Sequence, residues 1–175
     1  MKKTLIAGVT ALFLVSSVAA YAADWALPNA ATPGALNPAV TQANIATTVC
    51  KSGWTDTIRP PVSYTNKLKA AQLAKGGAYE SFPAIYGAAA ANYEEDHLIS
   101  LQLGGSPTDP KNLWPEPYAG SNARKKDVIE TALKRLVCSG KMTLAAAQKA
   151  ISTNWVTAYK VDVTPIDVKN VQSNG

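Results

Sequence analysis

Two turn signals near the middle of the chain constrain its fold most. Residues 104–107 read Gly-Gly-Ser-Pro and residues 109–110 read Asp-Pro, and such clusters end regular elements. Before them, residues 92–101 alternate loosely between apolar and polar side chains, which predicts a strand. After them, residues 112–114 predict a short return strand. A helix over residues 122–137 would complete a ββα unit, so the fold class that we expect is α+β.

Helices are predicted on both sides of this unit. Thr65 is a plausible N-cap for a helix over 66–74, and Thr143 for a last helix over 144–159. Pro115 and Pro117 are expected to stop the return strand. The helix over 122–137 has one apolar face with the spacing of a buried stripe, made of Val128, Ile129, Ala132, Leu133, Leu136 and Val137.

The chain is expected to hold one domain. Residues 23–41 are rich in Ala, Pro and Asn and predict an extended or disordered lead-in. A single domain is expected over 42–161, with its ββα core at about 93–137. Residues 162–175 show no clear pattern and are interpreted as a tail.

Residues 1–22 are typical of a signal peptide. Lys2 and Lys3 precede an apolar run, and residues 20–22 form a small-x-small cleavage site. The alternative is an uncleaved anchor, although the run is short for a spanning helix. Export predicts a periplasmic or secreted protein, in which Cys50 and Cys138 form one disulfide.

The charge of the chain is mildly basic. The formal net charge is +5, and loss of Lys2 and Lys3 with the signal lowers it to about +3. Such a charge permits nucleic acid as a partner without requiring it. Five basic residues share one predicted helical stretch: Arg124, Lys125, Lys126, Lys134 and Arg135. Arg124 and Lys125 are candidates for phosphate contacts, and the alternative is a solvated helix face.

One histidine dominates the candidate chemistry. His97 is the only histidine in the chain, and Asp96 precedes it directly. Asn112 and Asn122 follow at the expected starts of the return strand and of the helix. An imidazole base beside hard oxygen ligands can hold one divalent metal and activate one water, which is what phosphodiester cleavage needs. The alternatives are an ordinary hydrogen-bonded His97 and a plain N-cap role for Asn122.

This region resembles the HNH endonuclease family, and secreted bacterial HNH-like proteins in particular. The resemblance is carried by three segments: Glu95-Asp96-His97-Leu98-Ile99-Ser100-Leu101, Leu103-Gly104-Gly105, and Asp109-Pro110-Lys111-Asn112-Leu113-Trp114-Pro115-Glu116. It continues through 122–127 and extends more weakly to Cys50, residues 59–61 and Cys138. The family implies a ββα-metal (His-Me finger) core.

The resemblance also implies roles. His97 matches the general base, Asp96 a metal ligand, and Asn112 the residue that hydrogen-bonds and orients the base. Asn122 falls near a ligand position that is usually a histidine, so the chain departs from the pattern there. One carboxylate and one amide oxygen suit one Mg²⁺, Mn²⁺ or Ca²⁺ ion better than Zn²⁺, and we expect Mg²⁺ or Mn²⁺.

The expected function is metal-dependent hydrolysis of nucleic acid phosphodiesters with weak sequence specificity, with DNA favoured over RNA. We expect a monomer with no membrane span after signal cleavage. The main alternative is a non-catalytic exported envelope or binding protein that retains the HNH scaffold. It is motivated by the missing third histidine at Asn122 and by the modest charge. A third hypothesis is a toxin-like effector that acts on a competitor. The sequence gives it no support, because it shows neither a delivery domain nor an immunity partner.

Overall fold

A computed structural model of the chain describes residues 25–161. The predicted signal peptide and tail lie outside the described residues. Four α-helices are described, α1 (Val62–Leu73), α2 (Phe82–Tyr86), α3 (Asn122–Cys138) and α4 (Leu144–Val161), together with strands β1 (Tyr93–His97) and β2 (Leu113–Pro117). Six short 3₁₀ turns join them: Gln42–Thr47, Trp54–Thr57, Ala90–Asn92, Leu101–Leu103, Pro110–Asn112 and Ala119–Ser121. The α+β class and the order strand, turn, strand, helix are confirmed.

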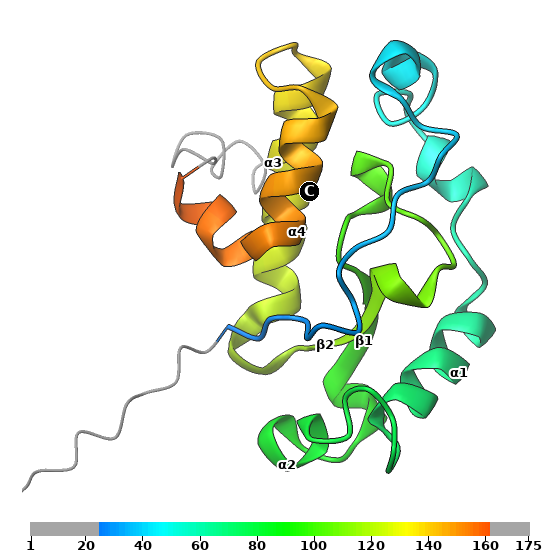
Figure 1. Cartoon of the computed structure of the whole chain (residues 1–175), viewed down its shortest axis with the longest axis vertical. Helices are drawn as coiled ribbons and strands as arrows, with labels where there is room; N and C mark the ends of the chain where they lie inside the picture. Colours follow the sequence, from blue (N-terminus) through cyan, green and yellow to red (C-terminus); the bar gives the residue numbers. More distant parts are fainter. Residues whose placement is uncertain (1–24, 162–175) are drawn as a thin grey trace, which may run out of the picture.

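The sheet is small and central. β1 and β2 are antiparallel, with Tyr93 opposite Pro117 and His97 opposite Leu113. The pair lies between α1 on one side and the α3–α4 pair on the other (Figure 1). The sheet thus carries the candidate residues Asp96 and His97 between two helical layers.

Pro115 lies inside β2 and Pro117 is the last residue of the strand, so the prediction that the strand stops at Pro115 is wrong. The flanking hydrogen bonds run from Leu98 N to Asn112 O and from Tyr118 N to Asn92 O. In an antiparallel pair this pattern alternates, which places both prolines opposite β1 residues at non-hydrogen-bonded positions. Their missing N–H groups face away from β1 and cost the ladder nothing.

The first predicted helix begins earlier than expected. α1 starts at Val62 and Pro61 is its N-cap, so Thr65 lies inside the helix. Pro61 has the extended backbone of an N-cap residue, and its carbonyl accepts from Tyr64 N and Thr65 N, which places Thr65 in the first turn. α4 is capped at Thr143, whose Oγ1 accepts a hydrogen bond from Ala146 N, as predicted. It contains a break at Asn154, with φ −168° and ψ 99°.

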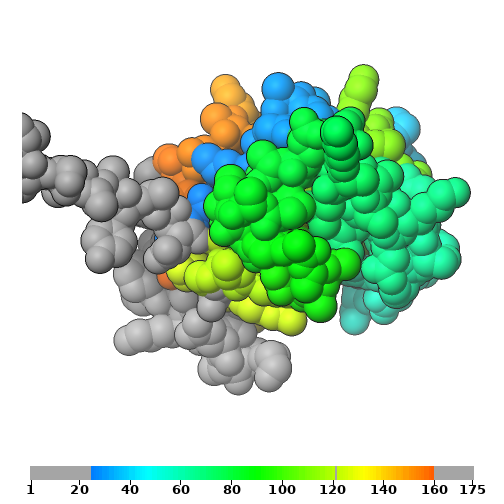
Figure 2. All heavy atoms as spheres, turned by 90° about the horizontal axis from the view of Figure 1, so that it is seen from below, coloured from blue at the N-terminus to red at the C-terminus, as the bar shows by residue number. Residues whose placement is uncertain are grey.

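The predicted lead-in is extended, but its described part belongs to the folded body. Ala26, Thr32 and Val40 are buried, and Trp155 Nε1 donates to Ala26 O. The N-terminal segment of the described chain, blue in Figure 2, lies between α4 and the segment around α2. Residues 25–41 therefore contribute to the core and are not disordered.

The predicted disulfide is present. Cys50 and Cys138 are bonded across a sequence separation of 88, which ties the segment before α1 to the end of α3. In the loop-entropy model such a closure stabilises by about 4–5 kcal/mol. The largest hydrophobic core lies between α3 and α4, around Ile129, Leu133 and Trp155.

Candidate functional site

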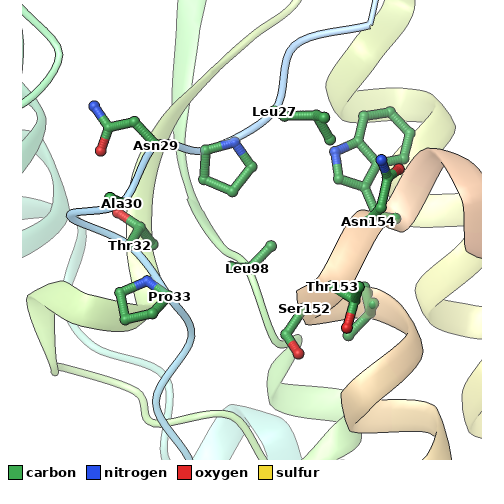
Figure 3. A pocket seen from close by; sticks show the side chains of 12 residues that line it. Leu27, Asn29, Ala30, Thr32, Pro33, Leu98, Ser152, Thr153 and Asn154 are labelled. Atoms are coloured by element: carbon green, nitrogen blue, oxygen red, sulfur yellow. The ribbon is translucent and has the colours of Figure 1, made fainter.

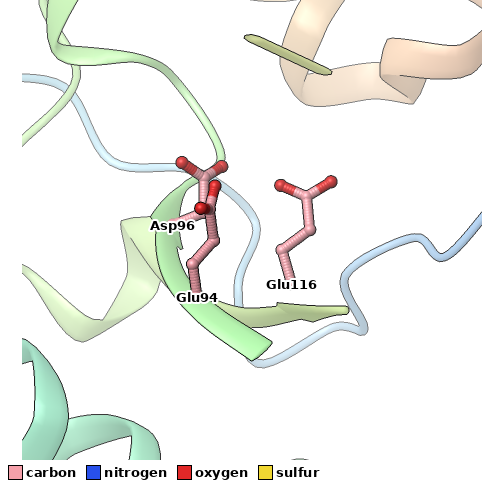
Figure 4. Close-up of side chains that lie close together, drawn as sticks. All are labelled: Glu94, Asp96 and Glu116. Atoms are coloured by element: carbon pink, nitrogen blue, oxygen red, sulfur yellow. The ribbon is translucent and has the colours of Figure 1, made fainter. Parts of the chain in front are cut away.

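Three carboxylates meet on one face of the sheet. Strand alternation places Glu94 and Asp96 on the same face, and Glu116 lies directly opposite Glu94 in the register. One oxygen from each of the three groups lies within 4.8 Å of the others (Figure 4). These three residues, called here the acidic cluster, could hold a metal ion.

Glu116 is the least expected member. It is fully buried, and neither of its carboxylate oxygens has a hydrogen-bond partner among the described residues. Burial raises the pKa of Glu116 well above its ordinary value, and the nearby Asp96 raises it further. No motif marks Glu116, and only its pairing with Glu94 brings it into the site.

A buried lysine closes the other side of the site. Lys126 in α3 is fully buried, and its ammonium donates to Asp96 Oδ2 at 2.5 Å, Glu130 Oε1 at 2.5 Å and His97 O at 2.8 Å. All three of its N–H donors are thus used. Ser100 Oγ donates to the other oxygen of Glu130 at 2.7 Å. Lys126 therefore pins α3 to the end of β1, rather than forming part of a solvated basic face.

The charges of this network explain its pKa shifts. Burial alone would lower the pKa of Lys126, but Asp96, Glu130 and Glu116 outweigh burial and raise it. Burial would raise the pKa of Asp96, but Lys126 holds it below its ordinary value. Burial raises the pKa of Glu130 to about 7 despite Lys126. Lys126 therefore favours the ionised form of Asp96.

His97 is held in a defined tautomer. Its ring is buried, and Nε2 lies 3.0 Å from Pro107 O. A carbonyl only accepts, so Nε2 carries a hydrogen and, in the neutral ring, Nδ1 is the free acceptor. Burial lowers the pKa of His97, and the positive charges of Lys126 and Arg59 lower it further, although Pro107 and Asp96 act in the opposite direction. His97 is a neutral base at neutral pH.

This state of His97 gives a direct prediction. Because the chain has one histidine, its imidazole ¹H–¹⁵N signals are unambiguous. We expect the Nε2–H tautomer at neutral pH and a titration midpoint below 6.5, the ordinary value. A midpoint above 6.5, or the Nδ1–H tautomer, would contradict the arrangement.

Asn112 does not orient the ring directly. Its side chain accepts from Ile99 N at 2.9 Å and donates to Ile99 O at 3.0 Å and Ser106 O at 2.9 Å. The predicted hydrogen bond between Asn112 and His97 is therefore absent among the described contacts. Asn112 holds Ser106 in place, and the carbonyl of the next residue, Pro107, accepts the hydrogen bond from the His97 ring. The turn also requires Gly105, because a Cβ there would lie 1.7 Å from Ile99 O.

Asn122 lies at the start of α3, fully buried, and neither polar atom of its amide has a partner. It has helical angles and makes no capping bond, so the N-cap alternative is wrong. Lys126, one turn later on the same face, reaches Asp96.

The two predicted phosphate contacts are engaged within the chain. Arg124 pairs with Asp127 at 3.3 Å, and its guanidinium lies 5.6 Å from the centre of the Tyr118 ring. Lys125 Nζ lies 4.4 Å from the ring centre of Trp25. Arg124 is exposed and accessible to a ligand, whereas Lys125 covers an aromatic surface.

Two of the cavities in the described part of the chain differ in their chemistry. One of about 250 Å³ lies between the N-terminal segment and α4, near Leu27, Leu98 and Asn154 (Figure 3), and no titratable side chain lines it. The other, of about 240 Å³ and called here the His97 cavity, is lined by Arg59, Glu94, Glu95, Asp96, His97, Ser100, Leu101, Gln102, Asp127 and Glu130. The His97 cavity is therefore the candidate reaction site.

Comparisons with protein-family models, with curated proteins and with solved structures find no match for the chain. Within residues 25–161, no helix has the length and apolar character needed to cross a bilayer. The function is therefore inferred from the site alone.

Proposed function

We propose that the chain hydrolyses nucleic acid phosphodiesters in a metal-dependent reaction, with His97 as the general base. The observation that carries this proposal is the fixed neutral imidazole of His97, which lines a polar cavity beside the acidic cluster. The order β1, β2, α3 supports interpreting the core as the ββα-metal unit of HNH endonucleases.

The donor set fits a hard divalent ion. Asp96 and Asn122 are the predicted ligands, and Glu94 and Glu116 add carboxylate oxygens. An ion there would give partners to the buried, unpartnered oxygens of Glu116 and Asn122. All donors are oxygens, which favours Mg²⁺ or Mn²⁺. When bound, the ion would neutralise charge on the phosphate and on the departing oxygen.

The residues of the chain would handle the proton. His97 Nδ1 accepts a proton from the attacking water, while Nε2–H stays bonded to Pro107 O. The ionised Asp96 favours the imidazolium that forms, because its negative charge raises the pKa of His97. Lys126 holds Asp96 and the His97 carbonyl in place both while the His97 ring is neutral and after it has accepted the proton.

The proposed setting is outside the cytoplasm. The Cys50–Cys138 disulfide is compatible with an oxidising compartment, and the apolar start of the sequence supports export to the periplasm or medium. We propose DNA as the main substrate and a monomer as the active form.

Metal dependence is the test of this function. Purified protein without residues 1–22 should nick supercoiled plasmid with Mg²⁺ or Mn²⁺, and excess EDTA should stop the reaction because the acidic cluster then lacks its ion. Nicking that is equally fast in EDTA would rule out the metal-dependent reaction.

A non-catalytic binding protein is the second candidate. It is favoured by one observation: Asp96 Oδ2 is already paired with the ammonium of Lys126. This positive charge takes the place that a metal ion would have beside Asp96. In that case calorimetric titration with Mn²⁺ would detect no binding to the folded protein, and plasmid would stay intact.

A further inference from the structure

We infer that Arg59 binds the phosphodiester of the substrate next to His97. The inference rests on the proposed function and names a residue to which no role could be given from the sequence. Arg59 comes from the segment before α1, far in sequence from the β1–β2–α3 unit. It lines the His97 cavity together with His97 and Asp96.

The backbone around Arg59 is constrained. Arg59 N donates to Thr55 O at 3.0 Å, and Pro60 and Pro61 follow directly. A residue before proline is restricted to extended conformations, and proline fixes its own φ. Pro60 is buried, whereas Arg59 is exposed. The chain thus presents this side chain from a rigid base, which lowers the entropy lost on binding a ligand.

The guanidinium of Arg59 is free to bind an anion. Within residues 25–161, its side chain has neither an ion pair nor a hydrogen bond. Arg59 is also the one cation among the residues that line the His97 cavity. Its five N–H donors are therefore available at the site.

Four of the five carboxylates that line the His97 cavity have other partners, and the exception is Glu95, whose buried oxygens lack a hydrogen-bond partner in the described part of the chain and whose pKa burial raises to about 8. Asp96 and Glu130 bind Lys126, and Asp127 binds Arg124. Glu94 accepts from the Tyr118 hydroxyl at 3.0 Å. These contacts explain how Arg59 stays unpaired in a cavity lined by acidic residues.

The ligand class follows from the chemistry of the guanidinium. A phosphodiester offers two anionic oxygens, which the planar fork of arginine can bind with two parallel hydrogen bonds. A contact to phosphate carries no base information. Binding through Arg59 would therefore hold the backbone beside Nδ1 of His97 without sequence preference.

Binding is tested separately from cleavage. A short fluorescein-labelled DNA oligonucleotide is titrated, with anisotropy as the readout, against His97→Ala protein in EDTA, where cutting is blocked. Adding Arg59→Gln should raise Kd about tenfold and reduce the slope of log Kd against log salt by about 1. The Kd of Arg59→Lys should lie between the values for Arg59 and for Arg59→Gln, because lysine keeps the positive charge but cannot make two parallel hydrogen bonds.

Lys149→Gln is the matched control, because Lys149 is an exposed cation on α4 that does not line the His97 cavity. If Arg59→Gln weakens binding no more than Lys149→Gln does, the assignment of Arg59 is overturned. That result leaves metal-dependent nicking by the unmodified protein intact. Loss of nicking with a normal Arg59 effect would overturn the proposed function instead.

Discussion

Replacing Lys126 with methionine should destabilise the protein by about 3–5 kcal/mol, because it leaves buried carboxylates without their counter-ion. Methionine has a similar length, so the loss concerns charge and hydrogen bonds more than volume. Asp96, Glu130 and the His97 carbonyl would each lose their bond to the ammonium. For a domain with an ordinary stability of roughly 5–15 kcal/mol, this is a large fraction.

Urea denaturation followed by circular dichroism measures this effect. Lys149→Met is the control, since Lys149 is exposed and should change stability by less than about 0.5 kcal/mol. Adding Glu130→Leu to Lys126→Met should recover part of the loss by removing one unpaired carboxylate. A Lys126→Met protein within about 1 kcal/mol of the unmodified protein would contradict the role of Lys126 as the central counter-ion.

Replacing His97 with alanine should slow plasmid nicking by about 10²–10⁴-fold, the usual contribution of a general base. The reactive form is the neutral imidazole, and burial lowers the pKa of His97 from its ordinary value of 6.5. The rate of the unmodified protein should therefore persist below pH 6.5 and fall only as the pH drops through the lowered pKa. The initial rate of nicking against pH measures this, and an acidic limb centred above 6.5 would contradict it.

The sequence predicts the local elements of this fold well. The turns before Asn112, the apolar stripe of α3 and the Thr143 cap are all local patterns, and the structure has them. The disulfide follows from two cysteines and an expected oxidising compartment. Prediction fails at Pro115, because whether a proline fits a strand depends on the side that its nitrogen faces.

The candidate site is predicted only in part. Asp96 and His97 are adjacent in the sequence, so their proximity is certain without a structure. In the sequence Lys126 looks like its basic neighbours Arg124 and Lys125, and only the packing of α3 shows that it is buried. Glu116 and Arg59 enter the site through strand register and through the path of a distant segment, which no local pattern contains.

The central claim is that His97 acts as the base in metal-dependent phosphodiester cleavage. The most direct measurement compares initial rates of supercoiled plasmid nicking in Mn²⁺ for the purified protein without residues 1–22 and its His97→Ala variant. Circular dichroism first establishes that both are folded. The account predicts nicking by the unmodified protein and a rate about 10²–10⁴-fold lower for the variant. Equal rates for the two proteins, or no nicking by either, would contradict it.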